Sequence, residues 1–345
     1  MAKSNILLTG ATGYLGGSVL IRLLNHPDIA SVNITALVRS PEKAEKLKPL
    51  GVNAVLGSHS DLALLEKLAS ESDVVIAMAD ADNIDAARAI LKGLKKRFEV
   101  TGQSPIYIHT SGTGVLADNA AGDHAYDIIY DDTNADQIET LAPTQIHRNV
   151  DLELVNADKE GYVRTFIILP STVYGIVTGK LVDLGIQHPY SLQVPAVIDA
   201  SVRRGQGGMV GAGKNLWPNV HIDDIADLYV TLLNAIHTKN PAATHGREGY
   251  YFGENGEHSM YQIGAAVAQA LVDIGKGKSA EPTSFTQDEI NLYFGGSPFL
   301  GVNSRCKGNR SRAIGWNPVK TTADLLASIK PDLEASFHRK SVLAG

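Results

Sequence analysis

The sequence predicts an α/β fold in which a doubly wound parallel sheet is flanked by helices. Short apolar runs alternate with amphipathic helical stretches through the first half of the chain, which is typical of such a sheet. The first apolar run ends in a turn with three regularly spaced glycines. After Gly175 the alternation becomes irregular and Gly, Pro and His become frequent. We therefore expect a Rossmann-like sheet followed by a smaller C-terminal region.

The glycine turn occupies residues 6–16, Ile-Leu-Leu-Thr-Gly-Ala-Thr-Gly-Tyr-Leu-Gly. It follows a buried strand and precedes apolar residues at helical spacing. Glycines let the backbone turn sharply and approach a pyrophosphate, whose charge the N-terminus of the next helix stabilises. The context predicts a dinucleotide-binding turn, with contacts from Thr9, Gly10, Thr12, Gly13, Tyr14, Leu15 and Gly16.

The remaining elements follow from hydrophobic periodicity. Strands are expected at 6–8, 33–38, 54–56, 74–77, 106–109 and 165–169. Helices are expected at 17–24, 41–48, 61–70, 83–97 and 146–156, and later at 223–236 and 260–274. Right-handed crossovers between the strands would wind the sheet in both directions.

Composition limits the range of partners. The chain has 345 residues and a formal net charge of −6, which argues against a nucleic-acid partner or an anionic membrane surface. Its single cysteine, Cys306, excludes an intramolecular disulfide and a Cys-rich metal site. We see neither a secretory leader nor a membrane span, so a cytoplasmic location is expected. The expected partner is a small-molecule substrate, and a homodimer is left open.

The end of the second strand predicts the choice of cofactor. NAD-binding domains usually place an acidic residue here, on the ribose 2′-hydroxyl. This chain has Arg39, with Ser40 and Lys43 nearby, a set that suits a 2′-phosphate. We expect NADP(H) in preference to NAD(H), although Arg39 could also be a solvated residue that opens a helix. Residues 57–61, which include Ser58, follow the third strand and could border the adenine, or Ser60 or Asp61 could simply cap the next helix.

Several further motifs occur in order along the chain: Ala77-Met78-Ala79-Asp80, His109-Thr110-Ser111-Gly112-Thr113, Pro170-Ser171-Thr172-Val173-Tyr174-Gly175, Val220-His221-Ile222-Asp223-Asp224-Ile225-Ala226 and Ala313-Ile314-Gly315-Trp316-Asn317-Pro318. With the glycine turn, they make the chain resemble the extended short-chain dehydrogenase/reductase superfamily, which includes NAD-dependent epimerases and dehydratases. The resemblance implies a Rossmann-like cofactor domain and a smaller substrate-binding region. It also implies cofactor contacts from Ala79, Asp80, Thr110, Pro170, Thr172 and Val173.

The resemblance breaks at the catalytic residues. Such enzymes generally combine a Ser or Thr after the fifth strand, matched here by Ser111, with a Tyr-x-x-x-Lys on the following helix. No such pair follows Ser111, and His147 and Asp151 stand where Tyr and Lys are expected. Residues four apart share a helix face, so Asp151 could orient His147 and raise its pKa. The two could equally form a structural hydrogen bond.

Two tyrosines are further candidates. Tyr130 lies in an insertion, residues 118–144, that is rich in ionisable groups, and long loops without periodicity often carry function. The insertion could also be a solvated acidic loop. Tyr174 follows the sixth strand at the edge where ligands bind in such folds, although it could only pack there. No metal site is expected, because the eleven histidines are scattered.

These features predict an NADP-dependent oxidoreductase that transfers hydride to or from a carbonyl or alcohol of a small organic substrate. A non-redox isomerase, epimerase or dehydratase on the same fold is an alternative, as is an NADP-sensing regulatory protein. We expect the NADP-binding domain to comprise residues 1–175 and 216–244, and the smaller substrate-binding region to comprise 176–215 and 245–345.

Overall fold

The computed structural model describes residues 3–343, and its centre is a seven-stranded parallel sheet. The strand order is β3-β2-β1-β4-β5-β7-β11, which is doubly wound from β1. The strands are β1 (Ser4–Thr9), β2 (Val32–Val38), β3 (Asn53–Leu56), β4 (Val74–Ala77), β5 (Ile106–Thr110), β7 (Arg164–Pro170) and β11 (Tyr250–Gly253). All six strands predicted for the first half are confirmed, and so is the Rossmann-like fold class.

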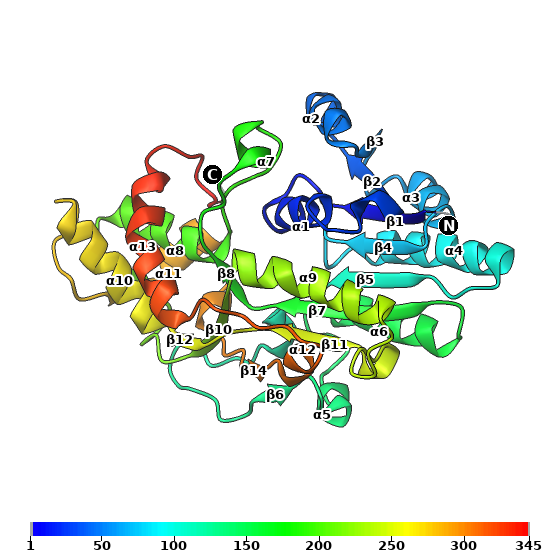
Figure 1. Ribbon diagram of the computed structural model, residues 1–345. Coiled ribbons are helices and arrows are strands. Elements are labelled where there is room, and N and C mark those ends of the chain that lie inside the picture. Colours follow the sequence, from blue (N-terminus) through cyan, green and yellow to red (C-terminus); the bar gives the residue numbers. More distant parts are fainter. Residues whose placement is uncertain (1–2, 344–345) are drawn as a thin grey trace.

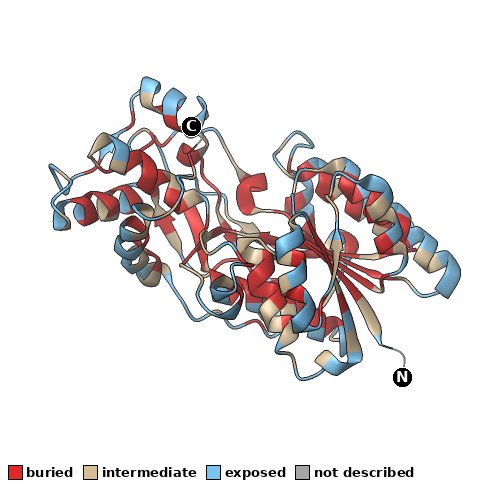
Figure 2. Cartoon of the chain, turned by 90° about the horizontal axis from the view of Figure 1, so that it is seen from above, coloured by how far each residue is buried: buried red, intermediate tan, exposed pale blue. Residues whose placement is uncertain are grey.

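Helices cover both faces of this sheet (Figure 1). One face packs against α1 (Tyr14–Leu24), α2 (Pro41–Leu47) and α9 (Ile222–His237), and the other against α3 (Leu62–Ser70), α4 (Ile84–Thr101) and α6 (Arg148–Lys159). Successive side chains of a strand point to opposite faces, so Ile6 and Leu8 join one core and Leu7 the other. Figure 2 shows the buried strands as a twisted fan between helices with exposed outer faces.

The edge strand β11 corrects the predicted domain boundary. We expected residues 245–345 in the smaller region, but Tyr250–Gly253 pairs in parallel with β7 in the main sheet. Tyr251 is buried in one core while Tyr250 and Phe252 are buried in the other. The prediction is therefore wrong for this strand, because a four-residue run gives too little periodicity to assign it to a sheet.

The smaller region gathers at the end of the molecule away from the N-terminus (Figure 1). Its own core lies among α8 (Gln193–Arg204), α10 (Met260–Asp273), α11 (Gln287–Phe294) and α13 (Thr322–Ser336). A three-stranded sheet, β8 (Thr172–Tyr174), β10 (Leu216–His221) and β12 (Glu257–Ser259), runs beside it. The remaining short elements are α5 (Ala135–Glu139), α7 (Lys180–Asp183), α12 (Asn309–Ala313), β6 (Tyr130–Asp131), β9 (Gly208–Met209), β13 (Thr283–Ser284) and β14 (Cys306–Lys307). Within residues 3–343, no helix is long and apolar enough to cross a membrane.

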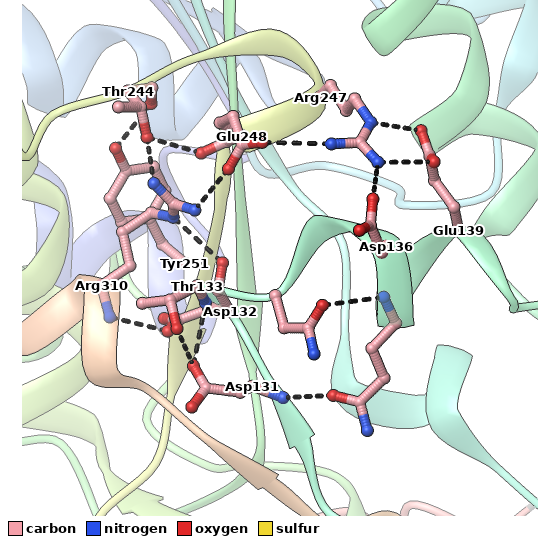
Figure 3. Close-up of polar contacts among 12 residues, drawn as sticks. Asp131, Asp132, Thr133, Asp136, Glu139, Thr244, Arg247, Glu248, Tyr251 and Arg310 are labelled. Carbon is pink, nitrogen blue, oxygen red and sulfur yellow. Dashed lines mark hydrogen bonds and ion pairs between the residues drawn. The ribbon is translucent and has the colours of Figure 1, made fainter.

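Asp132 ties the insertion to the C-terminal half of the chain (Figure 3). Its carboxylate accepts backbone N–H bonds from Arg310 (2.7 Å), Phe252 (3.1 Å) and Ser311 (3.2 Å). Burial raises the pKa of Asp132 to about 6, while the three backbone bonds oppose this shift. The insertion is therefore anchored through a buried carboxylate.

We expect Asp132→Ala to lower the free energy of unfolding by at least about 2 kcal/mol, because it leaves three buried backbone donors without an acceptor. Chemical denaturation of the two proteins measures this difference. Asp136→Ala is the matched control, since Asp136 pairs with Arg247 at a fully solvated position and such pairs contribute little. Equal losses in the two variants would contradict the anchoring role.

Candidate cofactor cleft and active site

The glycine turn is built so that the chain passes close to the end of β4. Gly10 has a φ of +71°, and a Cβ placed there would lie 2.5 Å from the carbonyl oxygen of Met78. A Cβ on Gly16 would overlap the carbonyl oxygen of Gly10. The backbone N–H of Gly13 donates to that same oxygen at 2.9 Å and closes the turn. Side chains at Gly10 and Gly16 are thus excluded by sterics, and α1 starts directly beyond the turn.

A cleft of about 650 Å³ opens above this turn. Ten residues predicted to bind the cofactor line it: Thr9, Gly10, Thr12, Gly13, Tyr14, Leu15, Arg39, Lys43, Ala79 and Val173. Eleven further residues complete the lining, and three of them, Gly57, His59 and Ser171, come from segments predicted to border the cofactor: Leu37, Val38, Gly57, His59, Met78, Ser171, His188, Tyr190, Ser191, Leu192 and Gln193. Most of these residues are next to predicted positions. Residues 188–193 belong instead to the smaller region, and the local sequence pattern does not show where that region lies relative to the sheet.

The other predicted cofactor residues do not line the cleft: Gly16, Ser40, Ser58, Asp80, Thr110, Pro170 and Thr172. Several of them use their side chains within the protein. Ser40 caps α2 by accepting the backbone N–H of Lys43, and the Thr110 hydroxyl is 2.7 Å from that of Tyr229. Thr172 donates to Gln193 at 3.1 Å. These groups support the walls of the cleft.

Two cations lie where the chain passes from β2 to α2: Arg39 directly follows β2, and Lys43 lies in the first turn of α2. Arg39 and Lys43 both line the cleft, and no ion pair among residues 3–343 includes either of them. The neighbouring carboxylate, Glu42, pairs instead with Lys46 at 2.6 Å. Burial lowers the pKa of Lys43, and the charges of Lys46 and Arg39 lower it further, while Glu42 raises it. An anion bound at this end of the cleft would therefore interact favourably with both cations.

His147 is held by Asp82, which corrects the predicted partnership with Asp151. Asp82 Oδ1 lies 2.7 Å from His147 Nδ1 and also accepts the backbone N–H of His147 at 3.1 Å. His147 precedes α6 with a φ of +67°, a backbone conformation that costs energy outside glycine. Its Nε2 points toward Gly112, 3.1 Å from where a Cβ would stand. His147 does not share a helix face with Asp151, because α6 begins only at Arg148.

Asp151 faces Ser111 instead. Asp151 is fully buried, and within residues 3–343 neither of its carboxyl oxygens has a hydrogen-bond partner, nor does the buried hydroxyl of Ser111. Burial raises the pKa of Asp151 from 3.8 to about 7, and the adjacent Ser111 hydroxyl and Arg148 oppose the shift. The buried carboxyl is therefore largely neutral below that pH.

This raised pKa predicts a pH-dependent loss of stability. Between about pH 4 and 7 the unfolded chain releases the Asp151 proton while the folded protein retains it, so stability falls as pH rises through this window. Asp151→Asn cannot ionise, and we expect it to raise the unfolding temperature by a few degrees at about pH 8 with little effect at about pH 4. Asp183→Asn, at an exposed carboxylate, is the control. If Asp151→Asn changed the unfolding temperature by the same amount at both pH values, the raised pKa of Asp151 would be refuted.

The two predicted tyrosines lie elsewhere. Tyr174 is fully buried and donates its hydroxyl hydrogen bond to the carbonyl of Thr321 at 2.8 Å, so the structure favours the packing role that the sequence also allows. Tyr130 lies in β6, which pairs with β14, and it packs against the core formed with α3, α4 and α6 rather than lining the cleft. Sequence reasoning missed Asp82, whose only local signal was its place just after β4.

A second histidine lies near His147. His109 is the penultimate residue of β5 and is buried, and among the described residues neither of its ring nitrogens has a hydrogen-bond partner. Burial lowers its pKa to about 4, and the charge of His147 contributes to this shift. Across the described residues, no group of three His, Cys, Asp or Glu side chains is arranged to hold a metal ion.

The parallel sheet, its glycine turn and the cleft above that turn define a Rossmann-fold protein with a candidate cofactor cleft. The NmrA-like family matches residues 2–97. Over 341 residues the chain is 30% identical to oxidase ucsJ from Acremonium sp., and the match covers 91% of this chain and 92% of that protein. The chain belongs to the extended short-chain dehydrogenase/reductase superfamily, as an unusual member without the Tyr-x-x-x-Lys pair.

Two other similarities concern part of the chain or the fold alone. A phenylcoumaran benzylic ether reductase from Ginkgo biloba is 38% identical over 101 residues, which cover 28% of this chain and 33% of that protein. The structure of DesIV, a dTDP-glucose 4,6-dehydratase from Streptomyces venezuelae with NAD and TYD bound, superimposes with a TM-score of 0.64. That match covers 98% of this chain and 99% of DesIV at 17% identity, so it shows the shared fold.

Proposed function

We propose that the protein is an NADP(H)-dependent oxidoreductase that transfers hydride between the nicotinamide and a carbonyl or alcohol carbon of a small organic substrate. The observation that carries this proposal is the pair of cations in the cleft, Arg39 just after β2 and Lys43 at the start of α2, neither of which forms an ion pair within residues 3–343. A guanidinium and an ammonium at this position suit a 2′-phosphate, whereas an NAD-binding domain usually has an acidic residue there.

The shape of the cleft also fits a dinucleotide. The backbone at Gly10 and Gly16 leaves no room for side chains, so the turn lets a pyrophosphate approach the N-terminus of α1. Val173 and Ser171, on the continuation of β7, line the same cleft and would border the nicotinamide. When bound, such a cofactor supplies or accepts the hydride.

His147 is the proton donor that we propose for the reduction direction. Asp82 occupies Nδ1, which leaves Nε2 as the nitrogen that exchanges a proton with the substrate oxygen. The ring is partly exposed, while its backbone is fixed by the same carboxylate. Ser111, which matches the family motif, would position the substrate oxygen. Asp82 thus takes the orienting role that we had predicted for Asp151.

The relatives support redox chemistry, since one is named an oxidase and another a benzylic ether reductase. Incubation of the purified protein with NADPH and a panel of carbonyl compounds tests the proposal. We expect loss of NADPH absorbance in proportion to product formed. Product formation without NADPH consumption would instead support the isomerase, epimerase or dehydratase alternative, and NADPH binding without any turnover would support the sensing role.

A further inference from the structure

A segment of the smaller region, residues 185–190, is fastened to the glycine turn. The backbone N–H of His188 donates to the carbonyl of Thr12 at 3.1 Å. The amide of the buried Gln187 donates at 2.8 Å both to the carbonyl of Tyr14 and to the hydroxyl of Ser18. The Gln187 side chain fills the space where a Cβ on Gly17 would stand. The two parts of the chain therefore meet at the cofactor cleft through specific contacts.

The His188 side chain faces this cleft with both ring nitrogens available. It lines the same cavity as Arg39 and Lys43, and within residues 3–343 no hydrogen bond includes its ring. The ring packs edge-on against Tyr190 with centroids 5.8 Å apart. The guanidinium carbon of Arg339 lies over the Tyr190 ring, 5.5 Å from the ring centroid. The Tyr190 ring thus packs against the imidazole, while the two ring nitrogens of His188 have no hydrogen-bond partner among the described residues.

The electrostatic surroundings of His188 are cationic. Besides burial, the charges that lower its pKa are those of Lys43 and Arg339. The segment also passes close to Lys46, whose ammonium lies 3.5 Å from where a Cβ on Gly185 would stand. An imidazole that faces a cleft beside cations is placed to donate a hydrogen bond to an anion.

We propose that His188 is a ligand of the 2′-phosphate of NADP(H), together with Arg39 and Lys43, so that the smaller region contributes to cofactor selectivity. This inference rests on the proposed NADP(H) dependence. His188 lines the same cleft as Arg39 and Lys43, and Gly185 of its segment lies beside Lys46 of α2, which favours the 2′-phosphate over the pyrophosphate.

Dissociation constants for NADPH and NADH, measured by calorimetry on the full chain, test this proposal. We expect His188→Ala to weaken NADPH binding by about tenfold or more and to change NADH binding by less than about twofold, because a hydrogen bond to a charged group is lost. His188→Lys keeps a hydrogen-bond donor at this position and should retain the preference for NADPH. His124→Ala, at an exposed histidine outside the cleft, is the control, and unfolding temperatures check that each variant folds.

Each other outcome decides against the inference in a distinguishable way. Equal weakening of NADPH and NADH would assign His188 to the pyrophosphate and overturn the proposed role. Loss of the NADPH preference in Arg39→Ala but not in His188→Ala would overturn the inference and leave the proposed function intact. An unmodified protein that shows no preference for NADPH would overturn both.

Discussion

Replacing Arg39 by aspartate should invert the dinucleotide preference of the protein. The change removes a charge-assisted hydrogen bond to the 2′-phosphate and places a carboxylate at the strand end where NAD-binding domains hold the ribose 2′-hydroxyl. We expect the ratio of the NADPH and NADH dissociation constants to change by about 10³-fold, through weaker NADPH binding and unchanged or tighter NADH binding. Calorimetric titration of the variant with each dinucleotide measures this ratio.

Lys67→Asp provides the matched control for this variant. Lys67 is an exposed cation on α3 outside the cleft, so the substitution makes the same change in net charge without touching the cofactor site. It should leave both dissociation constants within about twofold, because exposed charges beyond a Debye length are largely screened. Weakening by Lys67→Asp as large as that by Arg39→Asp would mean that Arg39 acts only through net charge.

His147→Ala should lower kcat by about 10²- to 10⁴-fold with a substrate found in the carbonyl panel, since proton transfer by a positioned side chain contributes that much. NADPH affinity should stay within about twofold, because His147 does not line the cofactor cleft. Steady-state kinetics together with calorimetry separate the two effects.

Asp82→Asn tests the assignment of His147 as proton donor through the carboxylate that holds it. It keeps a side chain of similar size but removes the carboxylate that orients His147 through Nδ1, so we expect a lower kcat. His124→Ala should leave kcat unchanged. If His147→Ala retained full kcat, the proton donor would have to be sought elsewhere.

Local sequence pattern predicted the parts of the site that belong to single β-turn-α units. The glycine turn, Arg39 and Ala79 each follow the end of a strand, and parallel strands bring their carboxyl ends to one edge of a sheet. Strand periodicity alone therefore placed these residues together, and the structure finds them in one cleft.

Local periodicity could not predict contacts between residues that lie far apart in the sequence. Asp82 and His147 are 65 residues apart in sequence, and their bond replaces a partnership inferred from helical spacing. The assignment failed because α6 starts one residue too late for His147 to lie on its first turn. His188 reaches the cleft only because the smaller region docks on the glycine turn, which no local periodicity reports.

The most direct test of this account is the affinity of the unmodified protein for NADPH and NADH, measured by calorimetry under the same salt conditions. The cations Arg39 and Lys43 in the cleft predict that NADPH binds at least about tenfold more tightly, since a hydrogen bond to a charged group is worth that much. Equal affinities, or tighter binding of NADH, would contradict the account.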